Sequence, residues 1–508
     1  MKKSIIQLTV LMLLVASTMQ SCTKNFVELN TSPNDSENAY PHQFMANVFI
    51  DAVAANMSRN RSFNNELMQV TVAIGDGEGK VFRYDFRRNW GEYLWNAHYI
   101  NINNFKEMYK QASKEVTLNT SYQGIALLGQ SWLFSILTDM YGDVPYSQAG
   151  LGLDSLLLEP KFDKQQDIYM GIFTTLDSVN NLFKANQSIE ATHDPIYAGD
   201  VSRWRKFSNS LFLRLLIRAS AKAETKDYVL GKIKEILETN KSNYPIIASN
   251  DDSAILRWTD EGYLLSPFKG TRVQDFRATA LSEFYIDYLR DTNDPRINIP
   301  VYGTGSVNRM GIAPVSGNYI GVPSGYSAGG EDYSKMSYFY SYDQNSGVNS
   351  LQTEPLTGSM LSFPEVEFMK AEAVLKGWVS GDVESLFYSG VLNNIKLWIP
   401  SYDEDIVAHL TASDRAWNNS ASFEDKMEAI HLQKYHAMFM VDMQQWYEYR
   451  RTGHPTLPKG AGLKNNGEMP ARMYYPVYVQ SANPTSYKNA IAIQGPDDIN
   501  TKVWWQKP

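Results

Sequence analysis

Hydrophobic residues recur with the spacing of an amphipathic α-helix along most of the chain. Ile125, Leu128, Trp132 and Ile136 fall on one face of a run that follows a cap-like Asn-Thr-Ser cluster and ends at a Tyr-Gly pair. Runs at 204–215 and 432–446 repeat this spacing, and the pattern predicts further helices at 42–57, 89–112, 165–184, 226–239, 274–290, 364–377 and 382–397. Because most of them are neighbours in sequence, the pattern indicates a mainly α fold of antiparallel helix pairs.

The helical period is interrupted between Pro245 and Pro355, where Gly, Ser, Asn and Tyr become frequent. A second interrupted stretch runs from Pro455 to Pro484. Irregular segments of this length are uncommon in a compact domain unless they form a binding surface. No linker-like break separates them from the helical runs. We therefore predict one helical domain over 39–508, with 245–355 as an irregular, loop-rich binding region.

The first residues have the parts of a secretory signal, with two lysines followed by an apolar run at 5–16 that is too short to cross a bilayer. The only cysteine, Cys22, follows directly and resembles the lipidated residue of a bacterial lipobox, although Met19 stands where Leu is usual. We predict a signal peptide over 1–21, lipidation of Cys22 and a polar tether over 22–38. An ordinary signal peptide with an incidental cysteine is the alternative.

Charge and motifs exclude several classes of function. The formal net charge of −8 disfavours binding to a nucleic-acid backbone. The Gly-x-Ser-x-Gly motif at 325–329 lacks the strand and helix that a nucleophile elbow needs. The seven histidines include no His-Glu-x-x-His pair. The carboxylate pairs 139/143 and 365/367 leave a surface glycoside hydrolase as a minor alternative. We expect no catalytic residue, metal site or cofactor.

Aromatic side chains are the remaining candidates for ligand contact, because flat rings stack on sugar faces and a nearby amide can bond hydroxyl groups. One group crowds the expected start of a helix, and the other lies in the irregular region. The ten candidates are Trp90, Tyr93, Trp95, Asn96, Trp258, Tyr263, Tyr326, Tyr333, Tyr338 and Tyr340. For the first group, burial in the core is the competing interpretation, since aromatic residues at helical spacing usually pack inside.

Eight segments, in order, resemble those of the SusD/RagB family of nutrient-binding outer-membrane lipoproteins. They are FVELNTSPN (26–34), the Trp-rich stretch 90–96, LTDMYGDVPYSQA (137–149), PKFDKQQDIYMGIFTTLD (160–177), the long basic-apolar stretch 194–218, NDPRI (293–297), FPEVEFMKAEAVLKGW (363–378) and WYEYRRTGHPTL (446–457). The chain departs from the family pattern at 387–391, where FYSGV replaces a Tyr-Tyr-Glu-Gly-Ile-like run.

The resemblance implies tetratricopeptide-like helix pairs that support an irregular ligand-binding region. It also implies a partner, a TonB-dependent SusC-like transporter, and a lipid-anchored location on the outer membrane. The expected activity is capture of glycans without catalysis and their delivery to that transporter. Capture of peptides, as the RagB side of the family implies, is an alternative that the sequence leaves open.

Overall fold

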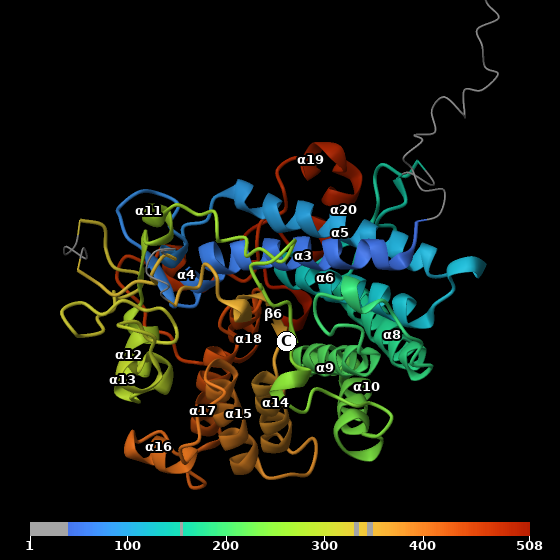
Figure 1. The fold of residues 1–508 in the computed structure, drawn as a ribbon. Coiled ribbons are helices and arrows are strands. Elements are labelled where there is room, and N and C mark those ends of the chain that lie inside the picture. Colours follow the sequence, from blue (N-terminus) through green and yellow to red (C-terminus); the bar gives the residue numbers. More distant parts are fainter. Residues whose placement is uncertain (1–38, 153–155, 330–334, 343–348, 508) are drawn as a thin grey trace, which may run out of the picture. The chain divides into compact units, whose positions relative to one another are not determined.

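The computed structural model describes residues 39–152, 156–329, 335–342 and 349–507. The predicted signal peptide, Cys22, the tether and Tyr333 lie outside the described residues. Pro41–Pro508 forms one compact unit, and helices dominate it (Figure 1). This confirms the mainly α fold expected from the sequence.

Most predicted helices are present with bounds close to those expected. The longer helices are α3 (Pro41–Arg59), α5 (Glu92–Gln111), α6 (Thr120–Tyr141), α8 (Gln165–Lys184), α9 (Val201–Ala219), α10 (Lys226–Lys234), α14 (Phe363–Leu375), α15 (Val383–Trp398), α17 (Phe423–Ala437), α18 (Gln444–Thr452) and α20 (Pro484–Gln494). The others, of nine residues or fewer, are α4 (Asn65–Leu67), α11 (Val273–Phe276), α12 (Glu283–Asp291), α13 (Ile299–Tyr302), α16 (Ile406–Ala412) and α19 (Val479–Ala482). The FYSGV segment that departs from the family pattern is part of α15.

Strands are short and pair antiparallel. β1 (Thr71–Ala73) pairs with β5 (Thr279–Leu281), and β2 (Val144–Pro145) pairs with β3 (Phe162–Asp163). β4 (Ala254–Ile255) pairs with β6 (Ser359–Leu361). Each pair joins segments that a helix or a long loop separates in sequence, so these strands tie loops to the helical frame.

Neighbouring helices pack against one another as the sequence predicts. α5, α6, α8 and α9 follow in order, α3 lies against α5, and α14, α15 and α17 form a second group. Side-chain caps begin four of these helices: the first-turn amides of α6, α9, α15 and α17 donate to the side chains of Asn119, Asp200, Asp382 and Ser422. Gly129 of α6 lies against the ring of Phe105 of α5, where an added Cβ would come within 2.3 Å of it. The absence of a side chain there allows the close approach of α5 and α6.

Two predicted helices were wrong as continuous elements. The run 274–290 is α11, β5 and α12, because its middle pairs with β1 and the Ser282 hydroxyl caps α12. The run 432–446 breaks between α17 and α18, where Met440 and Asp442 have φ values of 64° and 39°. The buried carboxylate of Asp442 accepts a hydrogen bond from Trp132 Nε1 at 3.0 Å, which holds the break against α6.

Candidate functional site

Several irregular segments lie against one another and form a surface that we call the loop face. It consists of residues 71–91, 268–282, 311–329, 335–342 and 458–468. The β1–β5 pairing joins the first two segments. The Leu281 amide donates to the Ser337 carbonyl at 2.8 Å, and the Lys464 amide donates to the Arg83 carbonyl at 2.7 Å. In Figure 1 the loops carrying α11 lie on the left, away from α8 and α10.

Tyr338 and Tyr340 form a pair on this face. Exposure alternates along 337–341: Ser337, Phe339 and Ser341 are buried, whereas the two tyrosines are half-buried. Because successive side chains of an extended segment point to opposite sides, both tyrosines project outward. Phe339 points inward and stacks on Phe439 at 5.8 Å between ring centroids. The tyrosine rings meet edge to face, with centroids 5.9 Å apart.

Backbone hydrogen bonds hold the tyrosine pair in place. The Tyr340 amide donates to the Gly311 carbonyl at 2.7 Å, and the Ala313 amide donates to the Tyr338 carbonyl at 2.9 Å. Partial burial raises the pKa of Tyr340, and the neighbouring Tyr338 adds to that effect. The Tyr340 hydroxyl therefore stays protonated in neutral solution and keeps its hydrogen as a donor. A rigid ring with a free polar edge suits stacking combined with hydrogen bonding.

Tyr326 belongs to the support of the loop face, since its side chain is only 9% exposed. Its ring stacks on Phe82 at 5.2 Å, and the Arg83 guanidinium lies 4.6 Å from its centroid. The Gly75 amide donates to the Tyr326 hydroxyl at 3.0 Å. These contacts fix the 71–91 segment against 322–329.

Trp90 and Tyr93 lie at the start of α5, close to Arg59 at the end of α3. Trp90 is half-buried and packs edge to face on Phe63 at 6.2 Å, and its carbonyl accepts a hydrogen bond from Arg59. The guanidinium also lies 5.4 Å from the ring of Tyr93, which is 46% exposed. Tyr93 is therefore the accessible ring of this motif, and Trp90 is mainly its support.

The remaining candidates lie elsewhere. Trp95 is 6% exposed and packs on Tyr99, while Tyr478 donates a hydrogen bond of 2.5 Å to Asn96. Trp258 is 2% exposed, so its indole is part of the core. Tyr263 is exposed, and its hydroxyl donates to the Thr192 carbonyl. The structure thus separates Trp95, Asn96 and Trp258 from the tyrosine pair.

Arg277 is a further residue of the loop face that sequence reasoning missed. It directly follows α11, is exposed, and places its guanidinium 5.6 Å from the centroid of Tyr338. In the predicted helix 274–290, Arg277 would be one of several solvent-exposed residues. The sequence therefore did not single it out as a ligand contact. The run Tyr-Phe-Tyr at 338–340 has no alternation of apolar and polar residues, so the sequence carried no signal for which of its rings faces solvent.

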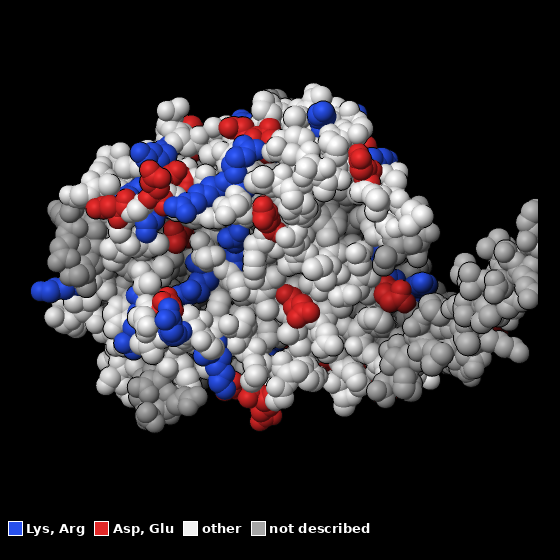
Figure 2. All heavy atoms as spheres, turned by 90° about the horizontal axis from the view of Figure 1, so that it is seen from above, with Lys and Arg blue, Asp and Glu red and all other residues white. Residues whose placement is uncertain are grey.

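Lys and Arg side chains gather on one half of the surface seen in Figure 2, which is the half that carries α11 and the loops. Exposed basic residues of the loop face include Arg87, Arg88, Arg272, Arg277 and Lys335. Asp and Glu side chains lie among them, as in the Arg272–Asp275 ion pair. The loop face is thus locally basic in a chain whose net charge is −8.

The carboxylates that sequence analysis considered for hydrolysis are parts of the scaffold. Asp139 is fully buried and ion-paired with Arg218, and Glu365 is fully buried and ion-paired with Arg214 at 2.6 Å. Asp143 accepts a hydrogen bond from the amide of Gln165 at the start of α8. Glu367 is 4% exposed and pairs with a lysine one turn on. These contacts leave neither pair facing an open cleft.

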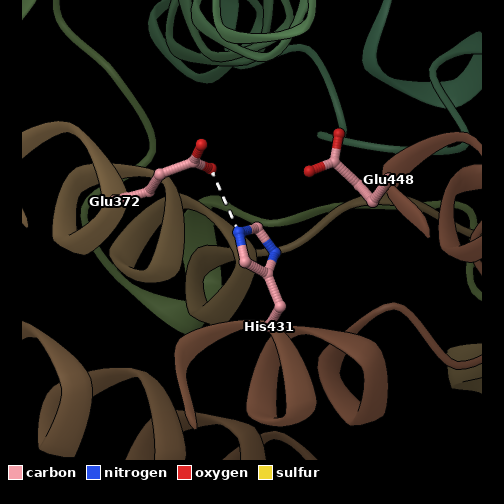
Figure 3. Close-up of side chains that lie close together, drawn as sticks. All are labelled: Glu372, His431 and Glu448. Atoms are coloured by element: carbon pink, nitrogen blue, oxygen red, sulfur yellow. Dashed lines mark ion pairs between the residues drawn. The ribbon is translucent and has the colours of Figure 1, made fainter. Parts of the chain in front are cut away.

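Glu372, His431 and Glu448 are the one group of described residues whose spacing could suit a metal ion (Figure 3). All three are buried, and cations already hold both carboxylates. Arg451 Nη2 lies 2.6 Å from Glu372 Oε2 and 2.7 Å from Glu448 Oε2. Burial lowers the pKa of His431 to about 3, so this histidine is neutral. The arrangement is that of a buried ion-pair network rather than an open ligand set.

The chain that leaves α18 for the loop face is anchored by His454. Its Nδ1 lies 2.6 Å from Glu428 Oε2 and its Nε2 lies 3.3 Å from Glu424 Oε2. The amide of Thr456 donates to Glu428 at 2.9 Å. The hydrogen bond with Glu428 raises the pKa of His454 despite partial burial. Protonated His454 therefore ties this segment to α17.

This contact predicts a pH-dependent contribution to stability. Because the pKa of His454 is higher in the folded chain, its contribution is full below the unfolded value of about 6.5 and is lost as pH rises through the folded value. We expect the substitution His454→Gln to cost on the order of 1 kcal/mol at about pH 6 and less at about pH 8. Urea unfolding at both pH values measures this. If His454→Gln costs the same stability at both pH values, or if the control His409→Gln shows the same dependence on pH, the contribution of protonated His454 is contradicted.

The described residues thus combine a frame of helix pairs with an aromatic, locally basic loop face. A family model described as starch-binding and associating with the outer membrane matches residues 33–476. The chain belongs to this SusD-like family. A search among curated proteins found no match.

Solved structures share the fold. A chitin-binding SusD homologue from Flavobacterium johnsoniae has a TM-score of 0.76 at 18% identity, covering 92% of this chain and 98% of its own. A SusD homologue from Bacteroides uniformis has a TM-score of 0.74 at 21% identity, covering 92% and 99%. A chitin-binding protein reaches 0.73 at 24% identity, with the same coverage of both chains. Within the described residues, no helix has the length and apolar character needed to cross a membrane.

Proposed function

We propose that this protein is a non-catalytic, glycan-binding lipoprotein of the outer membrane, which captures oligosaccharides on its loop face. The observation that carries the proposal is the outward-facing pair of Tyr338 and Tyr340 on a rigid segment. The family description as starch-binding and the chitin-binding relatives support a glycan as the ligand.

Binding on this face needs no chemical step. Sugar rings stack on the tyrosine rings, and the phenol hydroxyls and the Arg277 guanidinium supply hydrogen bonds to the ligand's oxygens. Tyr93 offers a further exposed ring on the same side of α5 as Arg59. Several weak contacts of this kind suit a protein that must release what it captures.

The proposal extends to location and partner. Lipidation at Cys22 would hold the protein at the outer membrane, and the anchor would raise its effective concentration beside a transporter. The partner is a TonB-dependent SusC-like transporter, which receives the captured glycan. Co-purification of the transporter with the lipidated chain, and its loss for a Cys22→Ala chain, tests this step.

Calorimetric titration tests the ligand class. The chain is titrated with a panel of plant, host and microbial polysaccharides beside mixed oligopeptides. Saturable binding of a glycan, without production of shorter fragments, is the expected result. If only peptides bind, the ligand is a peptide and not a glycan. If reducing ends are released from a glycan, the protein is a hydrolase.

A further inference from the structure

Arg277 has no acidic partner in the described part of the chain. No Asp or Glu there forms an ion pair with it, and its recorded contact is the ring of Tyr338. The other arginine of this segment, Arg272, is held by Asp275 at 2.6 Å, although both arginines are exposed. Within the described residues this guanidinium has no carboxylate partner, and it lies beside two outward rings where a ligand can reach it.

The backbone that carries Arg277 is held in place by its neighbours. The preceding residue, Phe276, is buried, and the guanidinium of Arg61 lies 4.6 Å from its ring centroid. Arg61 also donates a hydrogen bond of 2.9 Å to the Phe276 carbonyl. These contacts hold the end of α11 against the segment that follows α3. Arg277 therefore projects from a fixed part of the backbone beside the tyrosine pair.

Other basic groups of the loop face also lack an acidic partner among the residues that the structure describes. Arg87 donates to the Glu78 carbonyl at 2.9 Å, and neither Lys80 nor Lys464 forms an ion pair with a described residue. On the half of the surface that carries α11, Figure 2 shows many Lys and Arg side chains, with Asp and Glu side chains among them. Because Arg277 lies beside the tyrosine pair, an anionic ligand approaching the pair meets a favourable potential.

We propose that the loop face prefers oligosaccharides that carry carboxylate groups, and that Arg277 binds the carboxylate of a uronic-acid unit seated on Tyr338 and Tyr340. This inference rests on the proposed function and names its substrate class. The planar guanidinium can bind a carboxylate through two parallel hydrogen bonds, which gives orientation as well as attraction. A sugar ring that lies against the rings of Tyr338 and Tyr340 has the Arg277 guanidinium at its edge.

The test compares a uronic-acid oligosaccharide with its carboxyl-reduced, neutral counterpart, titrated into the full chain and into the variants Arg277→Gln and Arg272→Gln. The full chain is expected to bind the acidic oligosaccharide about tenfold more tightly than the neutral one. Arg277→Gln removes this preference, changes the affinity for the neutral ligand less than about twofold, and weakens the salt dependence of binding. Arg272→Gln, which carries the same change in charge, keeps the preference.

Three results would overturn the inference, and they differ from failure of the proposed function. Equal affinity of the full chain for the acidic and neutral oligosaccharides removes the substrate class but leaves glycan capture in place. If Arg277→Gln and Arg272→Gln lose the preference for the acidic oligosaccharide equally, the preference comes from the overall charge of the loop face and not from Arg277. Binding of an oligoglutamate peptide as tight as the acidic glycan, and equally dependent on Arg277, assigns the site to acidic peptides. Absence of binding to any glycan ends the proposed function itself.

Discussion

The substitution Glu448→Gln is expected to lower the free energy of unfolding by about 3–5 kcal/mol, among the largest effects of any single change in this chain. Glu448 is 2% exposed and is held by three cations. Its Oε1 lies 3.1 Å from Arg218 Nη2, and its Oε2 lies 2.8 Å from Lys434 Nζ and 2.7 Å from Arg451 Nη2. Urea unfolding followed by tryptophan fluorescence measures the loss.

The physical reason is the burial of the charges that would remain. Burial alone would raise the pKa of Glu448, but Arg451, Lys434 and Arg218 hold it well below its usual value, so the carboxylate is ionised. Glutamine keeps the shape but removes the charge and turns one acceptor into a donor that faces other donors. Buried cations without a counter-charge are costly.

This network also joins the two groups of helices. Arg218 comes from α9, Lys434 from α17, and Glu448 and Arg451 from α18, while Arg451 reaches Glu372 of α14. Glu468→Gln is the matched control, because that carboxylate is 72% exposed and makes a single contact of 3.5 Å with Lys459. A cost of less than about 0.5 kcal/mol is expected there. A cost for Glu448→Gln as small as that of the control would contradict the network's role.

The second large effect concerns ligand binding. The double substitution Tyr338→Ala and Tyr340→Ala is expected to weaken glycan affinity by about 30-fold, since each stacked ring contributes on the order of 1 kcal/mol and a factor of ten corresponds to about 1.4 kcal/mol. Calorimetric titration with the best glycan of the panel measures this. Urea unfolding of the same variant is measured in parallel, because both side chains are partly buried, while Phe339 keeps its inward contact with Phe439.

Tyr228→Ala provides the control for removal of an exposed ring. Tyr228 is 39% exposed on α10, which lies far from α11 in Figure 1, and its ring stacks on Phe173. Glycan affinity of this variant should equal that of the unchanged chain. Unchanged affinity of the double variant would remove the tyrosine pair from the site and move the search to Tyr93.

The helical frame could be predicted because its signals are local. The spacing of Ile125, Leu128, Trp132 and Ile136 and the cap at Asn119 lie within one stretch of chain, and α6 follows them. The predicted helices failed where distant segments compete with the local pattern. Thr279–Leu281 pairs with Thr71–Ala73, and Asp442 bonds Trp132 from α6. The spacing of hydrophobic residues in 274–290 and 432–446 gives no sign of either of these long-range contacts.

By itself, the sequence determined the mainly α fold, its helix pairs and, through its ordered motifs, the family. Only the tertiary structure decided which aromatic rings face solvent. Tyr93 and Trp95 stand two residues apart in one motif, yet Trp95 is buried because Phe162 and Tyr475 pack on it from remote parts of the chain. Arg277 likewise meets Tyr338 across 61 positions of sequence. Helix formation depends on neighbours along the chain, whereas exposure and a binding surface depend on what folding brings beside each residue.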